Sequence, residues 1–541
     1  MASPRVLIIG LDGAGWNLFE PWAESGRLPA LAALMRRGTW GALRSTVPAL
    51  TLPAWSTFMT GKNPGGHGVY GFRRLPWNRY EGAGLANARD LRAATIWDVA
   101  AAAGCRVGVI NVPPSYPLRP IPGGYVVGCM LTPPGQPFTD PAEVARELGE
   151  YEIDLQPPKN LRRSDADYRP RALAYLRGMA RQTRLRGEAT LRVMKVRPVD
   201  AQCVVFYAPD RVQHYFWEYV DPARTSPPPD EPEVREALMA VYAELDRAIG
   251  RLVDAVDPDT SIVLLSDHGF GQKPERSIRI NRWLADNGHL RRRPFWTLRR
   301  RVVRKLLPEP WRSRYDTTDF ILVDRARSQA WAETIFTGTA GIYVNVRGRY
   351  PLGCVAPGAE YESVRERIRS GLAGLRDEQG RPIFAAVERR EDLYHGPFRD
   401  EAPDLIAECT PQYGVLFESL RRELRVPELF GPFEELGYTG THDPDGLYLY
   451  AGPPFAALGR HEAQPIEAIP STILYALGVA IPCDFDAPPS ASAVRPEHWA
   501  AHPPQQQDAF GGVAGSDGQG WRSGEDEEHV ADHLRALGYL E

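Results

Sequence analysis

The sequence predicts an α/β fold in which a mostly parallel, doubly wound sheet is flanked by helices. Three continuous apolar runs, at residues 6–11, 201–207 and 261–265, are typical of central strands that are buried on both faces. Between the second and third runs, apolar residues recur at helical spacing from Val234 to Val256. Strands that alternate with helices in this way indicate a parallel sheet.

The remaining elements follow from shorter patterns of the same kind. Further helices are expected at residues 29–37, 95–103, 362–375 and 470–477, and the first two end at Gly38 and Gly104. Further strands are expected at residues 106–111, 341–346, 405–408 and 447–452.

The alternation of strands and helices is interrupted between residues 271 and 402, where the chain is richer in charged and turn residues. We therefore expect a core formed by residues 1–270 and 403–487, with residues 271–402 inserted as a cap beside the main sheet. Residues 488–525 are rich in Pro, Gly, Ser and Gln and are predicted to be a disordered linker. Residues 526–541 are predicted to form a short C-terminal helix.

The composition argues against several classes of protein. The chain has 541 residues, of which 43% are hydrophobic, so it can bury a large core, and its net charge of −4 argues against a polycation that binds nucleic acid. Its six cysteines include no CxxC pair, so neither a zinc ribbon nor a disulfide framework is indicated. The N-terminal apolar run is too short for a signal peptide or a membrane span, which predicts a cytoplasmic protein without a transmembrane segment.

A basic segment at residues 291–305 is interpreted as a solvated helix face, with a patch for anionic lipid, polyphosphate or nucleic acid as the alternative.

Four segments place acidic residues or histidines where a strand ends or on a loop near one. They contribute Asp12, Asp210 with His214, Asp267 with His268, and His442. Ligands of open α/β sheets gather at the carboxyl ends of strands, and Asp and His without thiolate suit zinc, manganese or iron. Each residue alone has an ordinary explanation, because an Asp at a strand end is often a helix cap and a single His is more often a hydrogen-bonded core residue. Together they are enough for two metal sites of three protein ligands each.

Thr51 opens an apolar run that continues through Leu52 and Pro53 and closes at Gly61. Proline near the start and glycine just past the end are typical of a helix. Thr51 is therefore expected at a helix N-terminus, where free backbone N–H groups and the helix dipole favour an anion. Taken alone, this position favours a helix cap over a nucleophile directed at a phosphate. The Asp and His residues elsewhere in the chain reverse that preference.

In their order along the chain, these residues resemble the alkaline phosphatase superfamily, and most of all its type I phosphodiesterase and nucleotide pyrophosphatase branch. In that branch the nucleophile lies in a Thr-aromatic-Pro-Asn motif, which Thr-Gly follows at a fixed distance. Here residues 51–54 read Thr-Leu-Pro-Ala and residues 60–61 read Thr-Gly. The resemblance covers about residues 5–485 and implies an alkaline-phosphatase-like core. Its C-terminal part also resembles bacterial proteins described as predicted phosphohydrolases or phosphomutases.

The resemblance implies a role for each residue. One divalent metal ion would be held by Asp12, Asp267 and His268 with Thr51 as fourth ligand, and a second by Asp210, His214 and His442. The ions are expected to be zinc, with manganese as the alternative. The enzyme would cleave a small phosphate ester, a phosphodiester in preference, through a covalent phospho-threonine intermediate. Arg211 is a candidate contact for a substrate phosphate oxygen, with a surface ion pair as the alternative.

Three positions depart from the patterns of related families. Ala54 stands where the branch has an Asn that contacts phosphate, so the resemblance does not extend to a nucleotide preference. Trp55 stands where sulfatases carry Arg, and Thr51 where they carry Cys or Ser, which argues against sulfatase chemistry. Two other functions remain open: a phosphomutase or phosphotransferase of the same superfamily, and a catalytically idle protein that binds a polyanion or a membrane. An idle protein would be expected to lack a ligand or the nucleophile, and none is missing.

Overall fold

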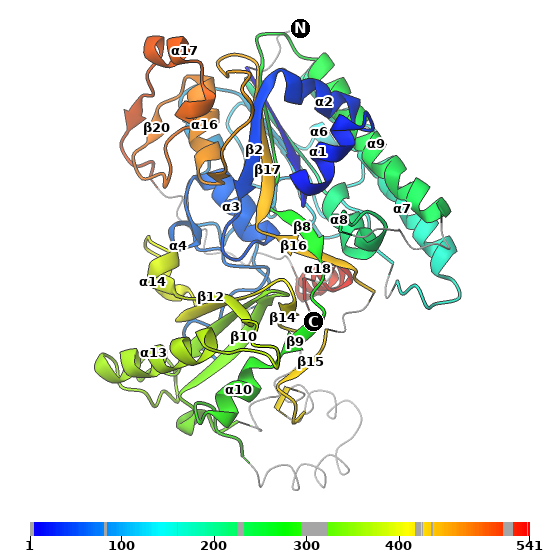
Figure 1. The fold of residues 1–541 in the computed structure, drawn as a ribbon. Coiled ribbons are helices and arrows are strands. Elements are labelled where there is room, and N and C mark those ends of the chain that lie inside the picture. The colour runs from blue at the N-terminus through cyan, green and yellow to red at the C-terminus, as the bar shows by residue number, and fades with distance from the viewer. Residues whose placement is uncertain are drawn as a thin grey trace.

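A ten-stranded mixed sheet is the centre of the larger part of the molecule, and a four-stranded sheet is the centre of the smaller part (Figure 1). The computed structural model describes residues 5–80, 84–158, 161–223, 232–293, 323–416, 423–424, 426–433, 437–511, 523–537 and 539–540. Helices flank the large sheet, and the α/β fold predicted from the sequence is confirmed. None of the helices in these ranges is both long and apolar enough to cross a membrane.

The middle of the large sheet is parallel. Its strands follow the order β18 (Gly459–Arg460), β2 (Gly38–Arg44), β17 (Asp445–Ala451), β7 (Ser261–Leu265), β1 (Val6–Leu11), β6 (Ala201–Phe206), β3 (Val107–Ile110), β4 (Tyr125–Val127), β5 (Thr139–Asp140), and β19 (Gln464–Pro465) also pairs with β2. The run from β7 to β4 is parallel throughout, whereas β17 is antiparallel to both of its neighbours. The strands expected at residues 106–111 and 447–452 are β3 and β17.

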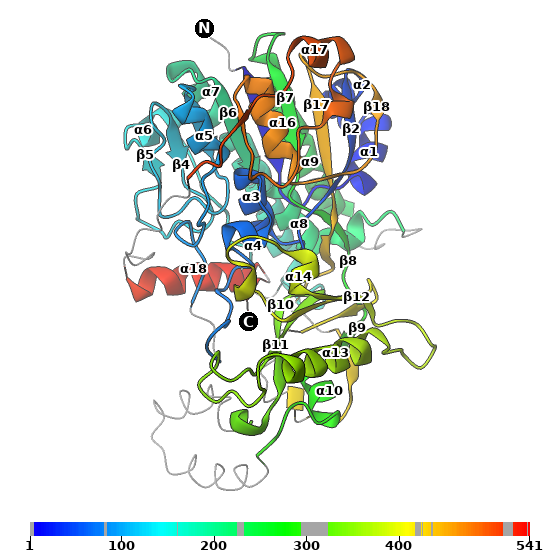
Figure 2. The ribbon, with the colours of Figure 1, turned by 90° about the vertical axis from the view of Figure 1, so that its left-hand side faces the viewer.

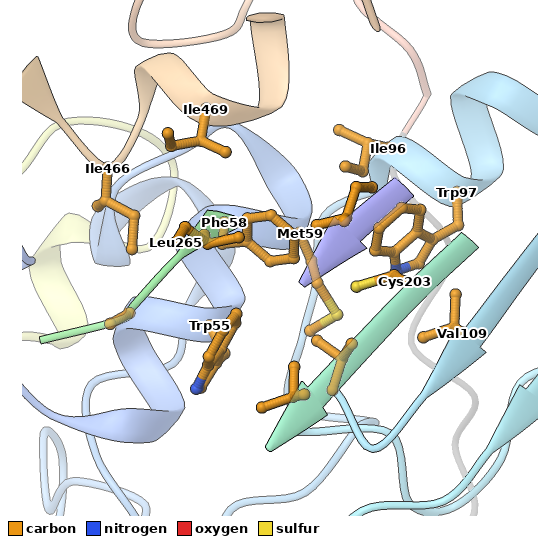
Figure 3. Close-up of a cluster of buried hydrophobic side chains, with 14 of the residues drawn as sticks. Trp55, Phe58, Met59, Ile96, Trp97, Val109, Cys203, Leu265, Ile466 and Ile469 are labelled. Carbon is orange, nitrogen blue, oxygen red and sulfur yellow. The ribbon is translucent and has the colours of Figure 1, made fainter. Parts of the chain in front are cut away.

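Helices cover the large sheet on both faces, because alternate residues of its buried strands point in opposite directions. From β1, Val6 and Ile8 join the core under α3 (Thr51–Thr60), α5 (Ile96–Ala102) and α16 (Ala468–Leu477). Leu7 and Ile9 join the core under α1 (Trp16–Glu24), α2 (Pro29–Arg36), α7 (Tyr168–Val196) and α9 (Pro232–Asp254). Figure 2 shows the two helical layers, and Figure 3 shows side chains of α3, α5 and α16 directed at the sheet.

The smaller part has its own hydrophobic core. Its antiparallel sheet has the order β10 (Ala330–Phe336), β11 (Thr339–Val344), β13 (Leu405–Cys409), β12 (Phe384–Arg389), with α13 (Ala359–Ala373) and α10 (Ile280–Asp286) packed in the same core. A three-stranded sheet of β14 (Tyr413–Gly414), β9 (Arg276–Ile278) and β15 (Phe430–Pro432) lies beside it. The strand expected at residues 405–408 therefore belongs to the smaller sheet rather than to the main core. It pairs with β11 and β12, and the chain re-enters the large sheet only at β17.

Short elements complete the described chain. They are α4 (Pro64–His67), α6 (Val144–Leu148), α8 (Ala208–Phe216), α14 (Arg390–Leu393), β8 (Gly269–Gln272), β16 (Gly440–Asp443), β20 (Ile481–Pro482) and the 3-10 turns η1 (Trp217–Tyr219), η3 (Arg325–Arg327) and η4 (Arg399–Glu401). Nearly all of the basic segment at residues 291–305 lies outside the described residues.

The prediction of a disordered linker at residues 488–525 is wrong for its first half. That stretch contains η5 (Ala491–Ala493), α17 (Pro496–Ala501) and β21 (Gln506–Gln507), which pairs with β20. Its Val494 is buried in the main core, and Trp499 and Phe510 pack against the same core, so a few apolar residues offset the Pro- and Gly-rich composition. Residues 512–522 lie outside the described chain. The C-terminal helix α18 (Gly524–Ala536) begins with a capping box between Ser523 and Asp526.

Candidate active site

Parallel pairing aligns the carboxyl ends of three central strands. Gly10 of β1 lies opposite Val205 of β6 and Leu265 of β7. The segments that follow these strands therefore leave the sheet at the same edge. Asp12 directly follows β1, and its carbonyl accepts a hydrogen bond from the N–H of Asp210 at 2.9 Å.

The first group of potential metal ligands consists of Asp12, Asp267 and His268. Their ligand atoms lie within 4.8 Å of one another, and all three residues are buried. His268 Nε2 lies 3.2 Å from Asp267 Oδ2 and 3.8 Å from Asp12 Oδ1. The opposite ring nitrogen, Nδ1, lies 3.0 Å from the carbonyl oxygen of Gly269. Because a carbonyl can only accept, Nδ1 carries the proton, and the lone pair of Nε2 points at the two carboxylates.

The second group consists of Asp210, His214 and His442. Asp210 and His214 lie one turn apart on α8, and His442 lies on β16. Asp210 Oδ1 lies 3.4 Å from His214 Nε2 and 3.2 Å from His442 Nε2, and the two Nε2 atoms are 3.3 Å apart. His442 Nδ1 faces the carbonyl oxygen of Ala49 at 3.0 Å, so its Nε2 also presents a lone pair to the group.

The two groups are adjacent because β16 pairs with β8, the strand that follows His268. In this pairing His442 lies opposite Phe270. The rings of His268 and His442 stack with centroids 3.6 Å apart and planes at 19°. One histidine from each group therefore lies in direct contact with the other.

The oxygen and nitrogen atoms that the two groups offer as metal ligands are suited to bind cations. Four of them, Asp12 Oδ1, Asp210 Oδ1, Asp267 Oδ2 and His268 Nε2, are buried and make no hydrogen bond with any described residue. When the carboxylates are ionised, each atom offers a lone pair and none offers a proton, so the atoms cannot satisfy one another. Buried polar groups without partners are rare in native proteins. A divalent cation in the first group would satisfy the atoms of Asp12, Asp267 and His268, and one in the second group would satisfy Asp210 Oδ1.

The pKa values of the site residues are also consistent with a metal site. Burial and the nearby Asp210 hold the pKa of Asp12 well above its ordinary value. Burial and the charge of Asp12 do the same for the pKa of Asp267. Burial, assisted by His442, holds the pKa of His268 well below its ordinary value. For Asp210, burial is outweighed by His214, His442 and Arg211, so its pKa lies well below the ordinary value. Crowded, desolvated carboxylates of this kind are typical of metal sites and active sites.

Thr51 is the first residue of α3, in a segment that contacts both groups. Its neighbours bind both groups: the carbonyl of Ala49 accepts from His442 of the second, and Trp55 Nε1 donates to Asp12 Oδ2 of the first at 3.1 Å. The helix begins without a side-chain cap, so the Thr51 hydroxyl does not serve as one. It is fully buried and donates instead to the Tyr539 hydroxyl at 3.3 Å. The helix ends at Gly61, whose φ of 67° is left-handed, as the sequence predicts.

Gly13 explains why a glycine follows Asp12. Its φ is +72°, and a Cβ at this position would lie 2.9 Å from the Cα of Asp210. Its N–H donates to Asp267 Oδ1 at 3.1 Å. The turn therefore brings the backbones of β1 and α8 together and holds the Asp267 carboxylate in place.

Arg211 is buried rather than at the surface, so the surface ion pair considered from the sequence is wrong. Its guanidinium donates to Asp154 Oδ2 at 2.8 Å and to Asp210 Oδ2 at 2.6 Å. Arg211 thereby orients the carboxylate of Asp210 from the side away from the two histidines. Its third contact, from Nη1 to the Tyr539 hydroxyl at 3.3 Å, points toward Thr51.

The sequence patterns missed three residues of the site: Trp55, Asp154 and Tyr539. Trp55 lies one helical turn after Thr51, which indicates that both side chains share a face of α3. This spacing is the one sequence feature that could have identified Trp55 as a site residue. Asp154 and Tyr539 lie in segments without any motif, and they reach the site only through tertiary contacts.

One family model matches most of the chain, and solved structures share similarity with it over most of its length. The model of the type I phosphodiesterase/nucleotide pyrophosphatase family matches residues 6–445. Mouse ectonucleotide pyrophosphatase/phosphodiesterase 5, in an inactive form with AMP, has a TM-score of 0.48 and 14% identity, over 88% of this chain and 96% of that one. Phosphonoacetate hydrolase from Sinorhizobium meliloti 1021, with phosphonoformate, has a TM-score of 0.48 and 17% identity, over 83% and 90% of the two chains. A search of curated proteins gave no match.

Proposed function

Because the chain belongs to the type I phosphodiesterase/nucleotide pyrophosphatase family, we propose that it is a two-metal hydrolase of small phosphate esters, with phosphodiesters preferred. In this proposal Thr51 is the nucleophile and forms a covalent phospho-threonine intermediate. The observation that carries the proposal is the convergence of two adjacent Asp/His groups, four of whose ligand atoms have no partner among the described residues, near one buried hydroxyl.

The two groups would each hold one divalent ion. Asp12, Asp267 and His268 would hold the first, with Thr51 beside it, and Asp210, His214 and His442 the second. Carboxylate oxygens and imidazole nitrogens suit zinc, and manganese is the alternative. When bound, such a pair of ions neutralises the negative charge that develops on the attacking and leaving oxygens of an in-line displacement.

The protein's own groups would position the reacting atoms. Thr51 Oγ gives up its proton and attacks phosphorus, the Oγ–P bond forms, and the bond from phosphorus to the leaving oxygen breaks, so that the leaving alcohol takes up one proton. A water molecule then attacks the phospho-threonine from the opposite direction, which restores the Thr51 hydroxyl and gives net retention at phosphorus. The N-terminus of α3 directs backbone N–H groups and the positive end of the helix dipole at the transferred phosphoryl group. Trp55 and the Gly13 N–H hold Asp12 and Asp267, so the first group keeps its geometry during both steps.

The test measures hydrolysis of bis(4-nitrophenyl) phosphate and 4-nitrophenyl phosphate by the purified protein, supplied with zinc or manganese. We expect the wild type to cleave the diester faster than the monoester, and elemental analysis to find two ions per chain. Thr51→Ala should lower kcat by roughly 1,000-fold or more, because it removes the nucleophile. Thr51→Ser, which keeps a hydroxyl on the same backbone, is the matched control and should retain measurable activity.

Equal activity of Thr51→Ala and wild type would refute the nucleophile assignment. Absence of cleavage of both esters with either metal would refute hydrolysis. Cleavage that requires an added alcohol, with the phosphoryl group recovered on that alcohol, would instead establish the phosphotransferase alternative.

A further inference from the structure

The C-terminal segment of the chain enters the candidate active site. After α18, Tyr539 lies with its side chain fully buried among site residues. Its hydroxyl accepts a hydrogen bond from Thr51 Oγ1 at 3.3 Å and donates one to Asp210 Oδ2 at 2.8 Å. Figures 1 and 2 show α18 at the junction between the larger and smaller parts of the molecule.

The Tyr539 hydroxyl is fixed by more than one contact. Arg211 Nη1 donates to it at 3.3 Å and also donates to Asp210 Oδ2 at 2.6 Å. The tyrosine, the arginine and the carboxylate therefore form a closed triangle of hydrogen bonds. The ring of Tyr539 stacks on Phe72, with centroids 4.3 Å apart and planes at 21°. A hydroxyl with so little freedom is suited to orienting its neighbour.

The segment that carries Tyr539 is anchored in the core of the larger part. Val530, Leu534, Leu537 and Leu540 are buried in the cluster that also contains α3 and α16. Polar contacts add to this anchorage: the Tyr438 hydroxyl donates to the carbonyl of Ala536 at 2.9 Å, and His533 Nε2 lies 3.0 Å from Asp154 Oδ2. A removable cover would expose these apolar side chains each time it opened. The anchorage therefore indicates that the C-terminal segment is a permanent part of the site rather than a removable cover.

We propose that Tyr539 is an active-site residue that orients the Thr51 hydroxyl for attack and contacts the transferred phosphoryl group. A threonine hydroxyl that donates its proton to Tyr539 directs its lone pairs elsewhere, toward the phosphorus and the first ligand group. Once Thr51 Oγ is bonded to phosphorus, the tyrosine hydroxyl can turn its single proton from Asp210 Oδ2 to a phosphoryl oxygen, while Arg211 continues to donate to Asp210 Oδ2. This inference rests on the proposed function, because it assigns Tyr539 a role only if Thr51 is the nucleophile.

The experiment compares Tyr539→Phe with wild type on bis(4-nitrophenyl) phosphate. The variant keeps the ring that stacks on Phe72 and removes only the hydroxyl. We expect kcat to fall about 10- to 100-fold, as for loss of one hydrogen bond to a charged group, with KM changed by less than about threefold. The release of nitrophenol in the first turnover should slow by the same factor. Zinc content by elemental analysis and the melting temperature should match the wild type.

Tyr438→Phe is the matched control. It removes a buried tyrosine hydroxyl that anchors the same segment through Ala536, and we expect its kcat to stay within about twofold of wild type. A chain that ends at residue 538 removes Tyr539 while keeping α18, and it should lose at least as much activity as Tyr539→Phe.

Three outcomes would overturn the inference, and one would overturn its premise instead. Wild-type kcat in Tyr539→Phe, with Thr51→Ala inactive, would show that Tyr539 has only a structural role. Higher activity of the chain that ends at residue 538 would show that the segment is an inhibitory cover. A fall in zinc content that accounts for the lost activity would show that Tyr539 serves metal binding alone. Full activity of Thr51→Ala would refute the proposed function itself.

Discussion

Asp12→Asn tests whether the first ligand group is built to hold a cation. Without metal, Asp12 is a buried carboxylate whose Oδ2 accepts from Trp55 and whose Oδ1 has no partner among the described residues. An Asn of the same shape can keep the bond from Trp55 and direct its amide N–H toward His268 Nε2, which lies 3.8 Å from Asp12 Oδ1 and also lacks a partner. The substitution removes a negative charge and satisfies an unpaired acceptor.

The magnitude follows from the cost of a buried group without a partner. Leaving one buried acceptor unsatisfied costs about 1–3 kcal/mol, and one such group is satisfied here. In the presence of EDTA we therefore expect Asp12→Asn to be more stable than wild type by about 1–3 kcal/mol. For a cooperative unit of several hundred residues this corresponds to a melting temperature higher by ~1–4 °C.

The assay is thermal unfolding followed by circular dichroism, in EDTA and again with zinc. Zinc at about 100 times its dissociation constant should stabilise the wild type by about 2.7 kcal/mol for each site. Asp12→Asn should lack the part of this stabilisation that comes from zinc bound to the first group. Asp246→Asn is the matched control, because Asp246 is also buried but accepts bonds from the N–H groups of Ala30 and Leu31 at 3.0 and 2.9 Å. It should lower the melting temperature in both conditions.

A lower melting temperature of Asp12→Asn in EDTA would refute the reasoning, because it would mean that the Asp12 carboxylate is satisfied without a cation. Equal stabilisation of wild type and Asp12→Asn by zinc would refute the assignment of Asp12 as a ligand.

Two further predictions concern pH and the backbone. Burial raises the pKa of Asp12 and Asp267 in the folded chain well above its ordinary value, so folding without metal is favoured when these groups are protonated. In EDTA, the stability advantage of Asp12→Asn should thus be largest near pH 8 and vanish near pH 4; an advantage independent of pH would contradict this. Gly13→Ala should lower the melting temperature and zinc affinity together, because φ is +72° and the new Cβ would lie 2.9 Å from the Cα of Asp210. Gly26→Ala, at φ +77° with open space around it, is the control for strain alone, and an equal loss in both would show that the contact with Asp210 is unimportant.

Much of the larger part was predictable because its strands are buried on both faces. A strand of this kind must be apolar throughout, so residues 6–11, 201–206 and 261–265 stand out in the sequence. The longest helix, α7 (Tyr168–Val196), was not predicted. Its many arginines lower the mean hydropathy of the segment and mask the apolar stripe that packs on the sheet. The strand predicted at residues 405–408 exists as β13, but the prediction placed it in the wrong sheet, because a short apolar run does not specify its partner.

The sequence by itself determined that the Asp and His residues of the two groups would meet, because the carboxyl ends of parallel strands bring such residues to one edge. It also predicted Thr51 as the nucleophile, which stays a prediction. Only the tertiary structure decided that Arg211 is buried against Asp154, that Trp55 holds Asp12, and that Tyr539 reaches Thr51 from 488 residues away along the chain. These contacts join segments whose spacing in the sequence obeys no periodicity. Their geometry depends on how the helices and the C-terminal segment pack, which no local pattern encodes.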